Sequence, residues 1–274
     1  MANFPTHIAV GTLVSGALAT VTVAADMVAP ENIIAVTLAG VLGSVLPDID
    51  LKDSRPARAM FNGLAVFFSF AVLFSLAHKY SIAEMLILWI GTLLVVRFVG
   101  KETFARFSYH RGVWHSILAM VFCALITAWV FKFLLGRNDS VSWLAAGFLA
   151  MGYLTHLILD ELYSVDVMDT RIKASFGTAL KVYDYRRLDH SGAMAVATVL
   201  VFLVTPPMRG FVTDLTSPGL WSSLQQRLLP QDQWFRGVKM TSKHAQDTKA
   251  DEPSPAGASP IATGSLPETA GEKK

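Results

Sequence analysis

The sequence has few charged residues and a single cysteine. Asp, Glu, Lys and Arg make up 16% of the 274 residues, against about 25% in a typical soluble domain. Hydrophobic residues make up 53%, which excludes a disordered chain and an ordinary soluble enzyme. Cys123 lies in an apolar run, so neither a disulfide framework nor a thiolate metal site can be built. The net charge of +2 gives no indication of nucleic-acid binding.

Long apolar runs predict an all-α, polytopic membrane protein with about seven transmembrane helices. The runs cover 8–29, 31–46, 61–77, 82–99, 113–135, 141–159 and 193–206. The second run is short, because ~16 residues reach only ~24 Å of the roughly 30 Å hydrocarbon core. A signal peptide is the alternative for the first run, but no Lys or Arg precedes it.

Composition divides the chain into three predicted parts. Residues 1–208 form the membrane-embedded domain. In residues 209–239, the spacing of Trp221, Leu224 and Leu228 favours an interfacial amphipathic helix, with a loosely ordered loop as the alternative. Residues 240–274 are polar and are expected to be a disordered tail.

Basic residues are unequally distributed between the two faces that seven spans would create. The loops near 47–60, 97–112 and 160–192 contain twelve Lys and Arg, whereas the opposite face has only Lys79, Lys132 and Arg137. The positive-inside rule therefore predicts that the first face, with the N-terminus, is cytoplasmic.

Seven residues of metal-ligand type lie near the ends of the apolar runs, and this topology places all of them on the cytoplasmic face. They are His7, Asp48, Asp50, His110, His115, His156 and Asp160. Because the topology was derived from Lys and Arg alone, the shared face is an independent indication of one polar site. Ionisable groups in membrane segments are costly unless they are paired or functional.

The strongest local pattern is His156 with Asp160, since positions i and i+4 share one face of a helix. Asp48 and Asp50 can turn to one ion in a segment stiffened by Pro47. His110 and His115 flank the start of an apolar run. A solvated turn and a His–Asp pair at a helix end are the alternative interpretations.

These segments resemble the bacterial membrane-bound metal-dependent hydrolase family of the YdjM type. The resemblance covers residues 3–207 and rests on Thr6-His7, GSVLPDID at 43–50, HRGVWHS at 110–116, HLILD at 156–160 and SFGTALKVYD at 175–184. It implies a helical inner-membrane protein and a metal-dependent hydrolase. The order of histidines and aspartates is also similar to that of zinc-dependent phospholipase C, an analogy of ligand spacing only.

Nitrogen and oxygen ligands without cysteine suit zinc or manganese, and also iron. Seven candidates exceed the four ligands of tetrahedral zinc, so they predict two ions, or one ion with supporting neighbours. Asp48 or Asp50 is expected as general base and Arg111 as the group that binds an anion.

The sequence therefore predicts metal-dependent hydrolysis of a membrane-associated substrate, such as a phosphoester lipid. The absence of HExxH and GxSxG motifs disfavours a zincin protease and an α/β-hydrolase. A metal-binding scaffold and a metal-ion transporter are the alternatives. A transporter is disfavoured because its ligands should lie near the bilayer midplane rather than at one face.

Overall fold

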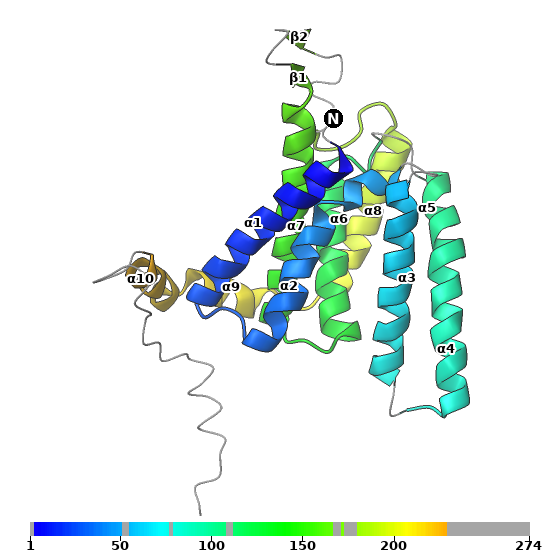
Figure 1. Cartoon of the computed structure of the whole chain (residues 1–274), viewed down its shortest axis with the longest axis horizontal. Helices are drawn as coiled ribbons and strands as arrows, with labels where there is room; N and C mark the ends of the chain where they lie inside the picture. The colour runs from blue at the N-terminus through cyan, green and yellow to red at the C-terminus, as the bar shows by residue number, and fades with distance from the viewer. Residues whose placement is uncertain are drawn as a thin grey trace, which may run out of the picture. The chain divides into compact units, whose positions relative to one another are not determined.

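The protein is a bundle of helices (Figure 1). This computed structural model describes residues 3–50, 55–76, 79–107, 112–166, 171–172 and 180–228. The first half contains α1 Phe4–Ala24, α2 Pro30–Gly43, the 3-10 helix η1 Leu46–Asp50, α3 Arg55–Leu76, α4 Ile82–Leu94, the π-helical turn η2 Val95–Gly100 and α5 Lys101–Phe107. The second half contains α6 Ile117–Trp129, the π-helical turn η3 Val130–Leu134, α7 Asp139–Leu162, β1 Val165–Asp166, β2 Arg171–Ile172, α8 Leu188–Val204, α9 Arg209–Thr216 and α10 Pro218–Arg227.

The all-α, polytopic prediction is confirmed. Only β1 and β2, two residues each, form a strand pair within the described part of the chain. Five helical segments are long and apolar enough to cross a membrane: Phe4–Ala24, Ala57–Leu76, Ile82–Phe104, Ile117–Leu134 and Asp139–Leu162.

The number of spans differs from the expected seven. A sixth is reached if α8 and α9, which are bent by 84°, form one broken span. Helix α2 has 14 residues and reaches only about 21 Å, less than the hydrocarbon thickness. The expected seven included this short run, which is a shorter apolar helix than the candidate spans.

Polar side chains cap the beginnings of several helices, among them α1, α6 and α7. The Asn3 side chain accepts a hydrogen bond from the backbone N–H of Thr6 at 3.0 Å and caps α1. Ser116 caps α6, and Asn138 caps α7. Each cap satisfies a backbone donor that the first helical turn leaves without a partner. The caps of α1 and α6 matter for the candidate site, because His7 and His115 lie beside them.

Helices α1, α2 and α7 pack against one another, and glycine permits the closest approach (Figure 1). A Cβ atom at Gly43 would overlap the backbone carbonyl of Leu149, and one at Gly152 would overlap that of Gly40. Small residues at helix interfaces are a common way to bring membrane helices together. This contact sets α2 directly against α7.

Helices α3 and α4 form a hairpin beside this three-helix core (Figure 1). Helix α3 contacts η1 and η3 in the rest of the bundle, and the Ser75 hydroxyl donates a hydrogen bond to the Leu134 carbonyl. No residue of α4 is buried. Its exposed apolar side chains, such as Ile87 and Leu94, are those expected of a helix that faces lipid.

The predicted interfacial segment begins with the short helices α9 and α10. Leu220 is buried, whereas Trp221 and Leu228 are exposed. Arg227 donates a hydrogen bond to the Ala24 carbonyl at 2.5 Å, which ties α10 to the end of α1. An interfacial position for this segment stays a prediction, and the predicted tail, 240–274, lies outside the described residues.

Candidate metal centre

The structure brings six of the predicted ligands together at one end of the bundle. His7 lies in the first turn of α1, and His156 and Asp160 lie in the last turns of α7. Asp48 and Asp50 belong to η1, and His115 directly precedes the Ser116 cap of α6. The other two predicted site residues, His110 and Arg111, lie outside the described residues.

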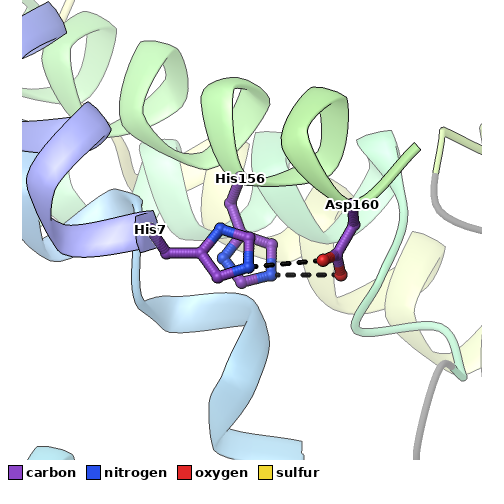
Figure 2. Close-up of side chains that lie close together, drawn as sticks. All are labelled: His7, His156 and Asp160. Atoms are coloured by element: carbon purple, nitrogen blue, oxygen red, sulfur yellow. Dashed lines mark ion pairs between the residues drawn. The ribbon is translucent and has the colours of Figure 1, made fainter. Parts of the chain in front are cut away.

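His7, His156 and Asp160 form a buried group within this cluster. The imidazole rings of His7 and His156 are stacked, with centroids 3.7 Å apart. Figure 2 shows both rings directed towards the Asp160 carboxylate. His7 Nε2 lies 3.3 Å from one carboxylate oxygen, and His156 Nε2 lies 3.6 Å from the other. All three side chains are at most 1% exposed.

A backbone carbonyl fixes the orientation of the His156 ring. His156 Nδ1 lies 2.8 Å from the carbonyl oxygen of Ser44, which follows the last residue of α2. Because a carbonyl only accepts hydrogen bonds, Nδ1 must be the protonated nitrogen. Nε2, which lies near Asp48 and Asp160, is then the ring nitrogen left to bind a metal ion, the arrangement that metal-binding histidines commonly have.

Asp48, Asp50 and His115 complete the cluster from the other side. Asp48 Oδ1 lies 3.6 Å from His156 Nε2. His115 Nε2 lies 3.8 Å from Asp160 Oδ2, and its Nδ1 lies 3.0 Å from Asp50 Oδ2. Asp50 therefore contacts the ring nitrogen of His115 that is turned away from Asp160. A carboxylate at this position orients a metal-binding histidine.

The residues fit a divalent metal ion. Two groups have ligand atoms within 4.8 Å of one another: His7 with His156 and Asp160, and Asp48 with His115 and His156. In a tetrahedral site with bonds of about 2.1 Å, ligand atoms are about 3.4 Å apart. The nitrogen–oxygen distances among the histidines and aspartates of the two groups are 3.3–3.8 Å, close to that value.

Hydrogen bonding within the cluster is incomplete, which also favours a bound cation. Within the described part of the protein, both ring nitrogens of His7, Nε2 of His156 and both carboxylate oxygens of Asp160 make no well-formed hydrogen bond. Buried polar atoms are rarely left in this state without an ion or a water to bind them.

Two residues that the sequence did not single out hold the cluster in place. The Trp114 indole N–H donates a hydrogen bond to the Leu46 carbonyl at 2.8 Å, which links the start of η1 to the neighbour of His115. The buried Tyr153 hydroxyl donates to the Trp114 carbonyl. Tyr153 lies three residues before His156 on the same face of α7, and this spacing was the available signal.

The segment after residue 180 holds the start of α6. Backbone N–H groups of Ile117 and Leu118 donate to the carbonyls of Lys181 and Val182 at 2.9 and 3.0 Å. The Lys181 ammonium lies 3.2 Å from the buried Asp184 carboxylate. Two backbone donors in the first turn of α6 are thereby satisfied close to His115. No local sequence pattern indicated this long-range pairing.

A comparison with protein-family models assigns this chain to a family. The model of the YdjM inner membrane protein family matches residues 1–205. The chain belongs to the YdjM inner membrane protein family. Neither the curated proteins nor the solved structures gave a match. Membership confirms the family resemblance, and together with the apolar helices it identifies this YdjM-family protein as a multi-pass inner-membrane protein.

Proposed function

We propose that this YdjM-family protein is a metal-dependent hydrolase that acts on a phosphoester in the membrane. One observation carries the proposal: three histidines and two aspartates from α1, η1, α7 and the start of α6 converge with atoms 3.3–3.8 Å apart. Such a buried set of N/O ligands, without cysteine, suits zinc or manganese.

One divalent ion fits the described ligands better than two. Both candidate groups include His156, and its Nδ1 is committed to the Ser44 carbonyl. Its Nε2 can bind only one ion, so both groups converge on the same place. The proposed ligands are His7, Asp48, His115, His156 and Asp160. Asp50, which lies against His115 Nδ1, is proposed to orient that ring.

The exposed fractions of the proposed ligands indicate which of them also contacts substrate and water. Asp48 is 22% exposed, whereas the other four proposed ligands are at most 1% exposed. Substrate and water therefore reach the cluster at Asp48, which is placed to accept a proton from an attacking water. A bound divalent ion supplies Lewis-acid polarisation of a phosphoryl oxygen and lowers the pKa of water. Arg111 remains the proposed anion-binding residue.

A metal-stabilised scaffold is the second candidate, and the deep burial of His7, His115, His156 and Asp160 favours it. A structural metal site is closed, whereas a catalytic site keeps one position open.

Full-length protein should be purified in detergent, analysed for metal and tested with bis(p-nitrophenyl) phosphate and long-chain phospholipids. Hydrolysis that requires bound metal, and that is lost when a chelator removes the metal, supports the enzyme. Bound metal without hydrolysis of any substrate contradicts it.

We further propose that the cluster faces the cytoplasm, as the distribution of Lys and Arg indicates. Arg186 and Arg137 are exposed at opposite ends of the bundle. In intact cells, cysteine at position 186 should resist a membrane-impermeant thiol reagent, and cysteine at position 137 should react. A Cys123→Ser background removes the native thiol. The reverse labelling pattern would place the cluster on the periplasmic side.

A further inference from the structure

A large apolar cavity begins beside the candidate metal centre. Its volume is about 920 Å³, and it lies between α3 and the surface formed by α2, α6 and η3. At one end it is lined by Ile8, Ile49 and Trp114. These residues are the sequence neighbours of His7, of Asp48 and Asp50, and of His115. The cluster residues themselves do not line the cavity, but their sequence neighbours do, so this end of the cavity lies close to the polar cluster.

The lining of the cavity offers almost nothing to a polar ligand. Its side chains are apolar apart from the Cys123 thiol, the Thr127 hydroxyl and the indole N–H of Trp114. The Thr127 hydroxyl donates to the Cys123 carbonyl at 2.9 Å, and the Trp114 N–H donates to the Leu46 carbonyl. Because these donors are already satisfied, the cavity suits a hydrocarbon and would penalise a polar group.

The cavity is long enough for a lipid chain. Its lining extends from Trp114, before α6, to Leu135, after η3. The helical segment between them, Ile117–Leu134, has 18 residues and spans roughly 27 Å, which exceeds the roughly 15 Å hydrocarbon depth of one leaflet. A long apolar cavity of this kind beside a polar cluster matches a lipid, which joins a hydrocarbon chain to a polar head group.

The cavity is also accessible from the side of the bundle. Leu38 on α2 and Phe67 on α3 both line it, and their side chains are 60% and 44% exposed. In a membrane these surfaces contact lipid, so a chain can enter between α2 and α3 without crossing water.

We propose that this cavity holds the hydrocarbon tail of the substrate lipid while its phosphoester head group lies at the metal centre. This inference rests on the proposed function and names its substrate class: a lipid with a long chain attached to a phosphoester. Apolar contacts remote from the reacting atoms would then position the head group.

Gly63 offers a way to fill the cavity without disturbing the fold. It lines the cavity on α3, and a Cβ atom there would meet nothing within 4 Å. Gly91 on α4 has equally open surroundings and does not line the cavity. The pair Gly63→Phe and Gly91→Phe therefore separates cavity filling from the general effect of a phenylalanine on this hairpin.

The first measurement tests binding without hydrolysis. The full-length protein is reconstituted into phosphatidylethanolamine–phosphatidylglycerol vesicles that contain a phospholipid with a diazirine on its chain, and labelled peptides are mapped after illumination. Labelling of α6 should fall about tenfold in Gly63→Phe, as expected when about two methylene groups are excluded from the site. Labelling at the lipid-facing Ile87 should not change, and Gly91→Phe should resemble the unmodified protein. Equal α6 labelling in Gly63→Phe would overturn the inference.

The second measurement compares two substrates of the metal-loaded protein. Gly63→Phe should lower kcat/KM for a long-chain phospholipid about tenfold and leave bis(p-nitrophenyl) phosphate hydrolysis unchanged. Equal losses for both substrates would contradict a tail-binding role. If the unmodified protein hydrolyses neither substrate, the proposed function fails, and the labelling experiment still decides whether the cavity holds a lipid chain.

Discussion

Helices α7 and α4 are both long enough to cross the membrane, but they meet opposite surroundings. In α7, 67% of the most apolar stretch is buried inside the protein, whereas in the segment that contains α4 the value is 0%. Helix α7 has the lower mean hydropathy, 1.5 against 2.1. The less apolar helix is therefore the buried one, because it contributes polar residues and a glycine contact to the interior.

This comparison shows that hydropathy alone identifies membrane helices without telling which of them form the core. A helix that faces lipid needs only apolar side chains. A helix that packs on its neighbours needs small residues, and polar groups there must find partners inside the protein. Gly152, His156 and Asp160 meet these requirements on α7, and α4 has no equivalent cluster among the described residues.

Among the variants considered, the largest effect on metal binding and stability is expected from loss of a proposed ligand on α7. His156→Ala, Asp160→Asn and the double variant should each abolish metal binding, and their effects should not add because all remove the same ion. With metal at 1,000 times its dissociation constant, the stability lost is about 4 kcal/mol. Metal content by mass spectrometry and thermal unfolding with and without chelator measure both effects.

Asp26→Asn is the matched control for these variants. Asp26 lies beyond the opposite end of α1 with a φ of 56°, a conformation that asparagine also tolerates. The metal content of Asp26→Asn should equal that of the unmodified protein. If the double variant retains the full metal content, His156 and Asp160 are not ligands.

Truncating an apolar side chain should have a large effect in α7 and almost none in α4. Leu149 is 2% exposed, so Leu149→Ala should destabilise the protein by about 2–5 kcal/mol. Ile87 is 69% exposed, and Ile87→Ala should change stability by less than about 0.5 kcal/mol. Unfolding in detergent measures both variants. A similar cost at the two positions would mean that α4 is covered in the membrane, for example by another protein.

Glycine substitutions sharpen the comparison within α7 itself. Gly152→Ala would place a methyl group against the Gly40 carbonyl and should cost about 1–3 kcal/mol. Gly147 has open surroundings on the same helix, so Gly147→Ala should be neutral or stabilising by up to about 1 kcal/mol. Thermal unfolding and metal affinity should both respond to the first variant only. Equal stability of the two variants would show that α2 and α7 do not need such close contact.

The smallest effect is expected from the tail. Deletion of 240–274 should change neither membrane insertion nor metal content, because this composition buries too little apolar surface to offset the entropy of ordering. Membrane fractionation and metal analysis test the truncated protein. Loss of metal would show that His244 or a carboxylate of the tail reaches the cluster.

The sequence predicted the parts of the site that depend on local spacing. The i, i+4 pattern placed His156 and Asp160 on one helical face, and the positions of the apolar runs placed His7, Asp48 and His115 at the same end. The first prediction follows from helix periodicity, and the second follows from the alternating direction of successive membrane helices. The number of spans was less accurate, because α2 returns the chain to that end without the length of a full crossing.

Contacts between distant segments could not be predicted. The sequence treated Asp48 and Asp50 alike, and only the three-dimensional arrangement separates them: Asp48 faces His156, and Asp50 contacts the other side of His115. The same holds for the Ser44 carbonyl and for the link from Trp114 to Leu46. These interactions depend on which helices pack together, and one sequence contains no direct record of that.

The position of His7 has a consequence for how the protein is made. His7 leaves the ribosome well before its carboxylate partner Asp160, which lies near the end of α7. Until α7 has entered the bilayer and docked, the His7 imidazole must be accommodated by water, lipid head groups or the insertion machinery. The polar cluster is therefore completed late in biogenesis, and a chain that stops before α7 cannot assemble it.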